Sequence, residues 1–267
     1  ESAPHEGQLP SVDVVICTHN RPQMLREALG AVLAQDYPGQ ITVYLVFDRT
    51  EPEHALAHES DNRAVRVLSN TRKPGLAGAR NSGIAAGSGD LVAFCDDDDV
   101  WLPSKLSAQV AALGGEADTA VSGIIVEYGE TSQERVPSAD QMQLANLVRN
   151  RVMEAHPSTV IVRRSALASI GLVDEEIPGS YGEDFDWIIR AAQHGPIAVA
   201  PRPLVRVRWG GSQFSHDWAT IIDSFDYSLA KHDVFARDRH ALGRLLGRRA
   251  FAMAALRRPG SLRAAVR

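Results

Sequence analysis

The sequence predicts an α/β fold: a mostly parallel sheet flanked by helices, followed by a helical C-terminal extension. Short β-branched runs alternate with segments of helical spacing through residues 11–103, a pattern typical of right-handed β-α-β crossovers. Polar clusters follow three of these runs, at residues 18–21, Asp48 and residues 96–99. Because the carboxyl ends of parallel strands meet at one edge of a sheet, we expect the three clusters to share one crevice.

Four apolar runs predict the strands of the first part of the chain: residues 11–18, 41–47, 64–68 and 91–95. Pro22 can start a helix, and apolar residues then recur at helical spacing as far as Leu33. A second helix is expected over residues 79–86. The polar residues 51–62 fit either a short helix or a loop.

The pattern changes after residue 103 and predicts a less regular mixture. Helices are expected over residues 106–113, 144–151 and 185–194, with a further helix beginning at Ser165. Strands are expected over residues 120–128, 158–163 and 197–207, the last interrupted by Pro201 and Pro203. Residues 1–10 are polar, and we expect them to be flexible.

The composition is that of a globular protein and argues against several classes of protein: nucleic-acid binders, disulfide scaffolds and membrane-spanning proteins. The 267 residues are 44% hydrophobic and 23% charged, enough for a sizeable core. A formal net charge of −5 gives no electrostatic footprint for nucleic acid. Two cysteines, Cys17 and Cys95, indicate a reducing compartment rather than a disulfide scaffold. Without a signal-peptide pattern or an apolar run of ~20 residues, we expect a cytoplasmic protein, at most peripheral at the inner face of a membrane.

Four consecutive aspartates, Asp96 to Asp99, directly follow the apolar run 91–95. Like charges this close raise one another's pKa unless a cation neutralises them. Carboxylate oxygens suit Mg²⁺ or Mn²⁺, which keep coordination positions for water and substrate phosphates. Side chains alternate along a strand, so we expect one or two of the four to contact the metal. A solvated acidic turn is the alternative, and the bulky Trp101 beside the run argues against it.

Four segments together resemble the family 2 glycosyltransferases of the GT-A fold. They are VVICTHNRPQMLREAL at 14–29, NTRKPGLAGARNSGI at 70–84, LVAFCDDDDVWLP at 91–103 and GEDFDWIIR at 182–190. The resemblance implies a Rossmann-like core and transfer of a sugar, with inversion, from a nucleotide-diphosphate donor to an acceptor hydroxyl. UDP is the default nucleotide, with dTDP and GDP left open. It also implies a donor half at 11–103, an acceptor and catalytic half at 104–215, and a helical basic extension at 216–267.

The resemblance assigns roles to individual residues of these segments. The nucleotide-binding positions are Thr18, Asn20, Arg21, Asp48, Arg80, Asp96 and Asp97. Asp98 matches the metal ligand of the family's Asp-x-Asp signature. Asp184 matches the catalytic base of the family's Glu-Asp pair, in which Glu183 precedes it. From the residues alone, the same two acids fit the capping of a helix N-terminus equally well.

Two positions depart from the family's pattern. Arg49 follows Asp48 where the family has glycine, so the donor's base stays open. The family's Arg-x-His segment has no histidine here, and Arg208 or His216 is the candidate to replace it. His156 and Trp209 are further candidates for acceptor contacts. Their alternatives are a structural hydrogen bond for the histidine and a core position for the tryptophan.

The C-terminal extension is strongly basic, because nine arginines and one acid, Asp238, occur from Arg237 onward. Apolar residues between the arginines fit a basic amphipathic helix in peripheral contact with an anionic membrane. A solvated helix docked on the catalytic domain is the alternative. Co-sedimentation with liposomes, with and without the extension, distinguishes the two. The acceptor itself can be a glycan, a lipid-linked molecule or a small molecule.

Two other functions share the same pattern. A sugar nucleotidyltransferase also combines a nucleotide-binding fold with metal-binding acids. It would carry a glycine-rich phosphate loop where this chain has residues 18–22. A nucleotide-binding scaffold that has lost catalysis keeps the fold, and the presence of Asp98 and Asp184 argues against it.

Overall fold

The computed structural model describes residues 9–208 and 217–257. Trp209 and His216 lie outside the described residues, as do residues 1–8 and the last ten residues of the basic extension. No helix within the described ranges is both long enough and apolar enough to cross a membrane.

The strands confirm the predicted α/β class. They are β1 Val12–Thr18, β2 Ile41–Phe47, β3 His58–Glu59, β4 Arg63–Ser69, β5 Leu91–Asp96, β6 Val100–Trp101, β7 Thr119–Tyr128, β8 Thr131–Arg135, β9 Ile161–Arg163 and β10 Ile197–Arg208. Their order in the sheet is β3-β4-β2-β1-β5-β9-β7-β10-β6, and β8 pairs with β7. β4, β2, β1 and β5 are parallel, as are β7 and β10, and the short β9 joins the two groups by antiparallel pairing.

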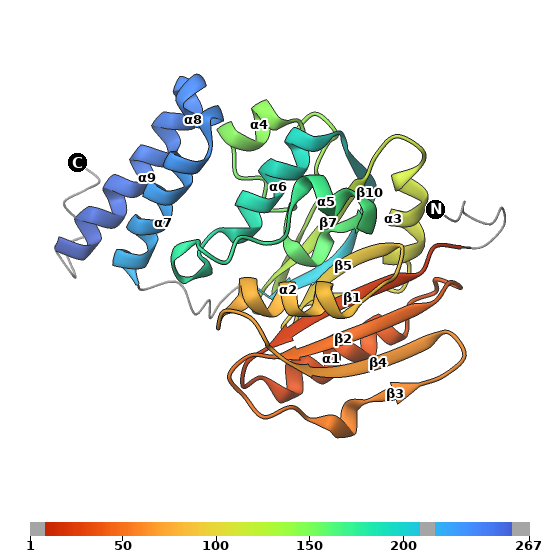
Figure 1. The fold of residues 1–267 in the computed structure, drawn as a ribbon. Coiled ribbons are helices and arrows are strands. Elements are labelled where there is room, and N and C mark those ends of the chain that lie inside the picture. The colour runs from red at the N-terminus through yellow and green to blue at the C-terminus, as the bar shows by residue number, and fades with distance from the viewer. Residues whose placement is uncertain (1–8, 209–216, 258–267) are drawn as a thin grey trace.

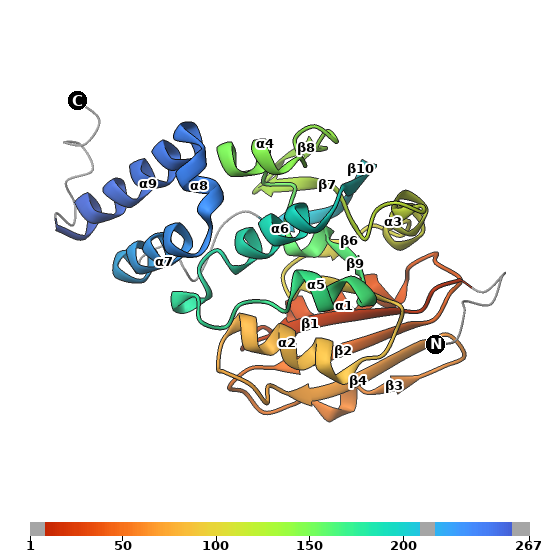
Figure 2. The same cartoon turned by 45° about the horizontal axis from the view of Figure 1, so that its top comes forward.

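Helices cover both faces of this sheet (Figures 1 and 2). They are α1 Pro22–Leu33, α2 Leu76–Ala86, α3 Lys105–Leu113, α4 Leu144–Arg149, α5 Leu167–Ile170, α6 Glu183–His194, α7 Trp218–Lys231, α8 Asp233–Arg237 and α9 Arg239–Arg257. Short 3₁₀ segments occur at His54–Leu56, Pro157–Thr159, Arg164–Ala166 and Pro178–Ser180. Apolar side chains of α1 and α3 fill one face of the sheet, and those of α2, α5 and α6 fill the other.

The central strand β1 is buried on both faces, as parallel strands under two helical layers are. Val14 and Ile16 join the cluster under α1, whereas Val15 and Cys17 join the cluster under α2. Gly83 allows α2 to lie this close, because a Cβ there would stand 2.4 Å from a Val15 methyl carbon. The close packing brings the side chains of α2 within reach of the strand ends.

The structure departs from the sequence-based expectation in its short and irregular elements. β3 and β8 are polar and mostly exposed, so no apolar run marks them, and β6 has two residues. Pro201 and Pro203 do not interrupt β10. The register against β7 shifts there instead, since prolines cannot donate to the ladder and bulges absorb them. Only Ile161–Arg163 of the expected strand 158–163 is extended.

The C-terminal helices α7, α8 and α9 pack on one another and on α4 and α6 (Figure 1). Ala241, Leu245 and Ala252 of α9 are buried in this third cluster. The helix is therefore docked on the domain. Leu246 and Leu256 remain 45% and 50% exposed, and membrane contact through the extension stays a prediction.

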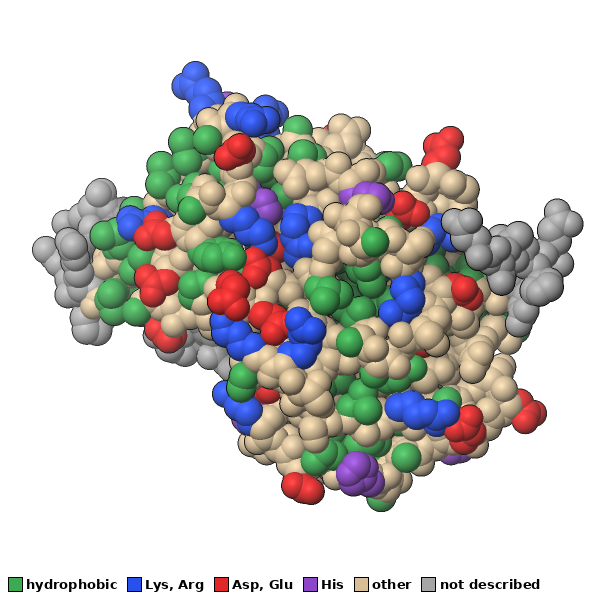
Figure 3. Space-filling model, in the orientation of Figure 1, with side chains coloured by type: hydrophobic (Ala, Val, Ile, Leu, Met, Phe, Trp, Pro, Cys, Tyr) green, Lys and Arg blue, Asp and Glu red, His purple; other side chains and the backbone are tan. Residues whose placement is uncertain are grey.

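Ion pairs also join these helices to the body of the molecule. Lys231 of α7 lies 2.5 Å from Asp174, which also accepts from the Tyr227 hydroxyl at 2.8 Å. Figure 3 shows charged side chains of both signs gathered between the C-terminal helices and α2. The wall that α7 and α9 form is thus anchored by packing and by charge.

Lys105, at the start of α3, is fully buried and lies over the Trp101 ring, 3.6 Å from its centroid. Within the described residues its Nζ has no hydrogen-bond partner. Burial lowers the pKa of this amine from 10.5 to about 7. At pH values between about 7 and 10.5, Lys105 is protonated in the unfolded chain and neutral in the folded chain. Stability therefore falls as the pH falls through this window.

Replacing Lys105 with Met should stabilise the fold. We expect the free energy of unfolding to rise by about 1–3 kcal/mol at pH 7, because an apolar side chain removes the desolvation cost. The difference in free energy of unfolding between variant and wild type should become smaller toward pH 10, where the unfolded lysine also loses its proton. Urea unfolding of both proteins at several pH values measures this, and a gap independent of pH would contradict the assigned cause.

Candidate functional site

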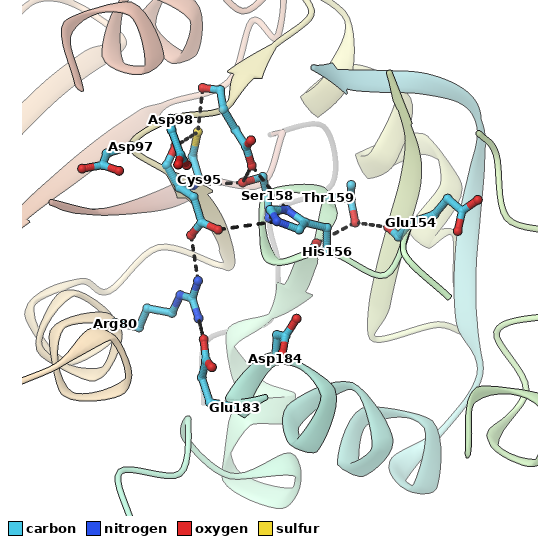
Figure 4. Close-up of polar contacts among 12 residues, drawn as sticks. Arg80, Cys95, Asp97, Asp98, Glu154, His156, Ser158, Thr159, Glu183 and Asp184 are labelled. Atoms are coloured by element: carbon cyan, nitrogen blue, oxygen red, sulfur yellow. Dashed lines mark hydrogen bonds and ion pairs between the residues drawn. The ribbon is translucent and has the colours of Figure 1, made fainter. Parts of the chain in front are cut away.

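The carboxyl ends of the parallel strands open into one cleft of about 1560 Å³. Thr18 ends β1, Asp48 follows β2, and Asp96 ends β5, and all three line the cleft. Glu183 and Asp184 line it from the start of α6 (Figure 4). The three polar clusters therefore lie in the single crevice expected from the topology.

Asp48 is held by donors from the loop that leads into α2. Its carboxylate accepts from Asn70 Nδ2 at 2.8 Å, from the Gly75 backbone N–H at 3.1 Å and from Arg49 Nε at 2.8 Å. Gly75 has φ +124°, a conformation that favours glycine. Burial pushes the pKa of Asp48 upward, but these hydrogen bonds outweigh it and hold the pKa below its ordinary value. Asp48 is thus an ionised acceptor at the mouth of β2.

Asp97 and Asp98 are tied to the segment after β1. Asp97 accepts from Thr18 Oγ1 at 2.7 Å and from Arg21 Nη1 at 3.1 Å. The same Arg21 nitrogen donates to Asp98 at 2.5 Å. Asn20 has φ +57° and is exposed, and it does not line the cleft. Arg21 thus partly neutralises the aspartate run.

Arg80 bridges the strand ends and α6 (Figure 4). Its guanidinium, 4% exposed, donates to Asp96 at 2.7 Å and to Glu183. Burial opposes the charge on this arginine, but the two carboxylates raise its pKa above the ordinary value. Burial raises the pKa of Glu183 to about 7, against the effect of Arg80. One guanidinium therefore pairs with a buried carboxylate, Glu183, and a half-buried one, Asp96.

Asp96, Asp99 and His156 form a cluster that fits a metal ion. One ligand atom from each lies within 4.8 Å of the others. Ser158 organises the cluster: its hydroxyl donates to Asp99 at 2.5 Å and accepts from the Asp96 N–H at 2.9 Å. Burial raises the pKa of Asp99 to about 7. Two carboxylates and an imidazole suit Mn²⁺ better than Mg²⁺, which prefers oxygen ligands.

Asp184 lies beside Glu183 at the first turn of α6 and points into the cleft (Figure 4). Its Oδ2 stands 3.4 Å from Arg151 Nη2, while its Oδ1 accepts from the Phe185 N–H at 2.8 Å. Its side chain is 18% exposed, so one carboxylate oxygen can meet a ligand in the cleft. This arrangement suits an acceptor of a proton from a hydroxyl group.

Several site residues were not expected from the sequence. Arg151 contacts the predicted Asp184, yet it lacks a motif of its own, whereas Asp99 belongs to the expected aspartate run and accepts from Ser158. Arg244 and Arg248 of α9 also line the cleft, although the sequence shows them only as part of a basic tail. Arg208 lines the cleft and pairs with Glu27 of α1. Trp209 and His216 belong to the part of the chain that is not described.

Replacing Glu183 with Gln tests the raised pKa of this carboxyl group. The folded-state pKa of Glu183 is raised above its unfolded value of 4.5. The contribution of Glu183 to folding stability is therefore present at low pH and is lost as the pH rises through about 7. We expect the stability of the variant relative to the wild type to rise between pH 5 and pH 8. Urea unfolding measures it. The exposed Glu176→Gln is the control, and parallel pH profiles for wild type and Glu183→Gln would refute the assignment.

Comparisons with known proteins find relatives among the glycosyltransferases. The β-1,3-glucosyltransferase WfgD of Escherichia coli, named for a UDP-Glc donor and an α-D-GlcNAc-diphosphoundecaprenol acceptor, is 26% identical over 102 residues. Those residues cover 38% of this chain and 40% of WfgD, so the match spans less than half of that relative.

Two solved structures share the fold. Staphylococcus aureus TarS 1–349 with UDP-GlcNAc matches with a TM-score of 0.62 at 19% identity, over 82% of this chain and 66% of that one. The mannosyltransferase PcManGT of Pyrobaculum calidifontis, with GDP-Man and Mn²⁺, matches with a TM-score of 0.59 at 20% identity, over 99% and 80%. The fold is the GT-A fold. A sequence profile described as Glycosyl transferase family 2 matches residues 13–171, more than half of the chain, and the chain therefore belongs to glycosyl transferase family 2.

Proposed function

We propose that this chain is an inverting glycosyltransferase that moves a sugar from a nucleotide-diphosphate donor to an acceptor hydroxyl. The observation that carries the proposal is the cleft itself. It has strand-end carboxylates on one wall and the Glu183–Asp184 pair on the other, with Arg80 between them. Few other activities need an acidic nucleotide site facing a separate carboxylate across one cavity.

The donor side of the cleft is suited to a nucleotide. Asp48 offers an ionised carboxylate to the amide or hydroxyl groups of a base or ribose. Thr18, Arg21 and Asp97 line the adjoining wall. UDP is the first candidate, because WfgD is named for a UDP-Glc donor and TarS was solved with UDP-GlcNAc. GDP is the second, because PcManGT was solved with GDP-Man.

Two sets of residues fit a metal ion on this side. Family resemblance favours Asp98, and the geometry favours Asp96, Asp99 and His156. A bound Mn²⁺ or Mg²⁺ supplies a Lewis acid for the charge that grows on the departing diphosphate. The chain's own contribution is to hold these carboxylates in place through Arg80, Arg21 and Ser158.

Asp184 is the proposed general base. It accepts the proton of the acceptor hydroxyl as that oxygen forms a bond to the anomeric carbon and the bond to the nucleoside diphosphate breaks. Direct displacement of this kind inverts the anomeric centre. Arg151, 3.4 Å away, orients the carboxylate.

Nucleotide binding is the first test. We expect calorimetry to show that one of UDP, GDP and dTDP binds in the presence of Mn²⁺. Asp98→Ala should weaken this binding at least ten-fold, since a lost ligand weakens the hold on the diphosphate. His156→Ala separates the two metal sets, because it weakens binding only if the ion contacts the imidazole. Asp233→Ala, at an 83% exposed position, is the control. Absence of binding for all three nucleotides would refute the proposal.

Asp184→Asn should keep nucleotide affinity and lose turnover. General-base help contributes about 10²–10⁴-fold, so release of nucleoside diphosphate from the donor should fall by about that factor. A coupled assay of nucleotide release with a panel of donors and acceptors measures it, with Asp233→Asn as the matched control. Wild-type turnover in Asp184→Asn would remove Asp184 from the mechanism. Tight nucleotide binding without turnover in the wild type would favour the inactive scaffold.

A further inference from the structure

The end of the cleft away from the strand ends is built by α7 and α9. Apolar and cationic side chains of these helices line it: Trp218, Ile221, Phe225, Arg244, Arg248 and Phe251. None of them belongs to the donor side. If the proposed function holds, this wall faces the acceptor, since Asp184 stands between it and the strand ends.

The two arginines that α9 turns to the cleft have no carboxylate partner within the described residues. Arg244 lies over the Phe185 ring, 5.2 Å from its centroid, and donates to the Val148 carbonyl at 3.1 Å. Arg248 lies over the Phe225 ring at 5.7 Å. By contrast Arg249, the next residue, turns away from the cleft and pairs with Asp226 at 2.5 Å. The cleft-facing cations are thus left without an anion.

A third cation, Arg151, lies near Arg244. Burial, together with the neighbouring charges of Arg248 and Arg151, lowers the pKa of Arg244 to about 10. Three guanidinium groups in mutual repulsion are stabilised by an anion that can accept from several at once, and phosphate oxygens suit such donors. A phosphate group bound at this place would restore the balance of charge.

The backbone of α9 is open at the same place. Gly243 and Gly247 lie one turn apart, each directly before a cleft-facing arginine, and both line the cleft. A Cβ at either position would meet no atom within 4 Å, so packing does not require glycine. Glycine inside a helix costs about 0.5–1 kcal/mol relative to alanine. Room for a ligand against the helix accounts for this cost.

The rest of the wall is apolar and partly open to solvent. Phe251 is 41% exposed and lies edge-on to Trp218, with ring centroids 5.8 Å apart. An apolar surface beside unpaired arginines matches a ligand that carries a hydrocarbon chain next to its phosphate groups. An acidic polysaccharide would match the arginines and leave this surface bare.

We propose that the α9 wall binds the diphosphate of a lipid-diphosphate-linked acceptor, with Arg244 and Arg248 on the phosphates and the hydrocarbon chain along Trp218 and Phe251. This assignment rests on the proposed function. Arg151 contacts Asp184, and its charge also acts on Arg244, so one side chain connects the base with the phosphate site. The acceptor's sugar lies between the two in this proposal. Its hydroxyl gives its proton to Asp184 and joins the donor's anomeric carbon, and the acceptor's own diphosphate stays intact.

Farnesyl diphosphate is a suitable probe. It is titrated by calorimetry into the full chain with UDP and Mn²⁺ at saturation, so that the donor site is filled. We expect binding, and at least ten-fold weaker binding in Arg244→Gln/Arg248→Gln, while UDP affinity is unchanged. Arg237→Gln, at a 79% exposed position of α8, is the matched control. Equal affinity of the double variant and the wild type for farnesyl diphosphate would overturn the proposal.

Two further probes separate the parts of the ligand. Inorganic pyrophosphate binding as tightly as farnesyl diphosphate would overturn the hydrocarbon part, and farnesol binding as tightly would overturn the phosphate part. Gly247→Ala should raise the melting temperature and yet weaken farnesyl diphosphate binding, a combination that a structural role for the glycine does not produce.

Failure of the proposed function can be distinguished from failure of the acceptor assignment. If no nucleotide binds, the farnesyl diphosphate titration is repeated with EDTA in place of UDP and Mn²⁺. Binding that still depends on Arg244 and Arg248 would then show a lipid-diphosphate site without a transferase. Nucleotide binding without any farnesyl diphosphate binding would overturn the acceptor assignment alone.

Discussion

Arg80 holds carboxylates from two elements that lie far apart along the chain: Asp96 at the end of β5 and Glu183 at the start of α6. A guanidinium presents its donors in one rigid plane and keeps its charge when buried, so it fixes both carboxylates at a set angle. Removing it would leave the buried Glu183 carboxylate without its cation, at a cost of about 3–5 kcal/mol. The width of the cleft between the strand ends and α6 depends on this contact.

The position of Arg80 depends in turn on how closely α2 lies on β1. Gly83 permits that approach, three residues along the same helix, and Gly75 begins the helix in a conformation that also presents its N–H to Asp48. A small displacement of α2 would therefore move the Asp48 contact and the Arg80 bridge together. The donor site and the placement of Asp184 are consequently linked through a single helix.

The sequence predicted the strand-end wall of the cleft well because its features are local. Strands β1, β2, β4 and β5 are apolar runs, and the polar residues that follow them needed only the rule that parallel strands end at one edge. The pairing of Arg80 with Glu183 spans 103 positions, and no periodicity encodes it. The contact of Ser158 with Asp96 and Asp99 was missed for the same reason: a hydroxyl between two carboxylates is a tertiary contact. The polar strands β3 and β8 lacked the apolar run by which strands are found.

The two walls of the cleft come from different parts of the chain with respect to the family profile. The family profile matches residues 13–171, which include every strand-end carboxylate of the donor side. Asp184 and the whole of α7 and α9 lie beyond that match. A donor site can stay recognisable in sequence because one chemical group, a nucleotide diphosphate, constrains it. The acceptor contacts that we propose fall on α9, where Arg244 belongs to a basic tail in the sequence and lines the cleft in the fold.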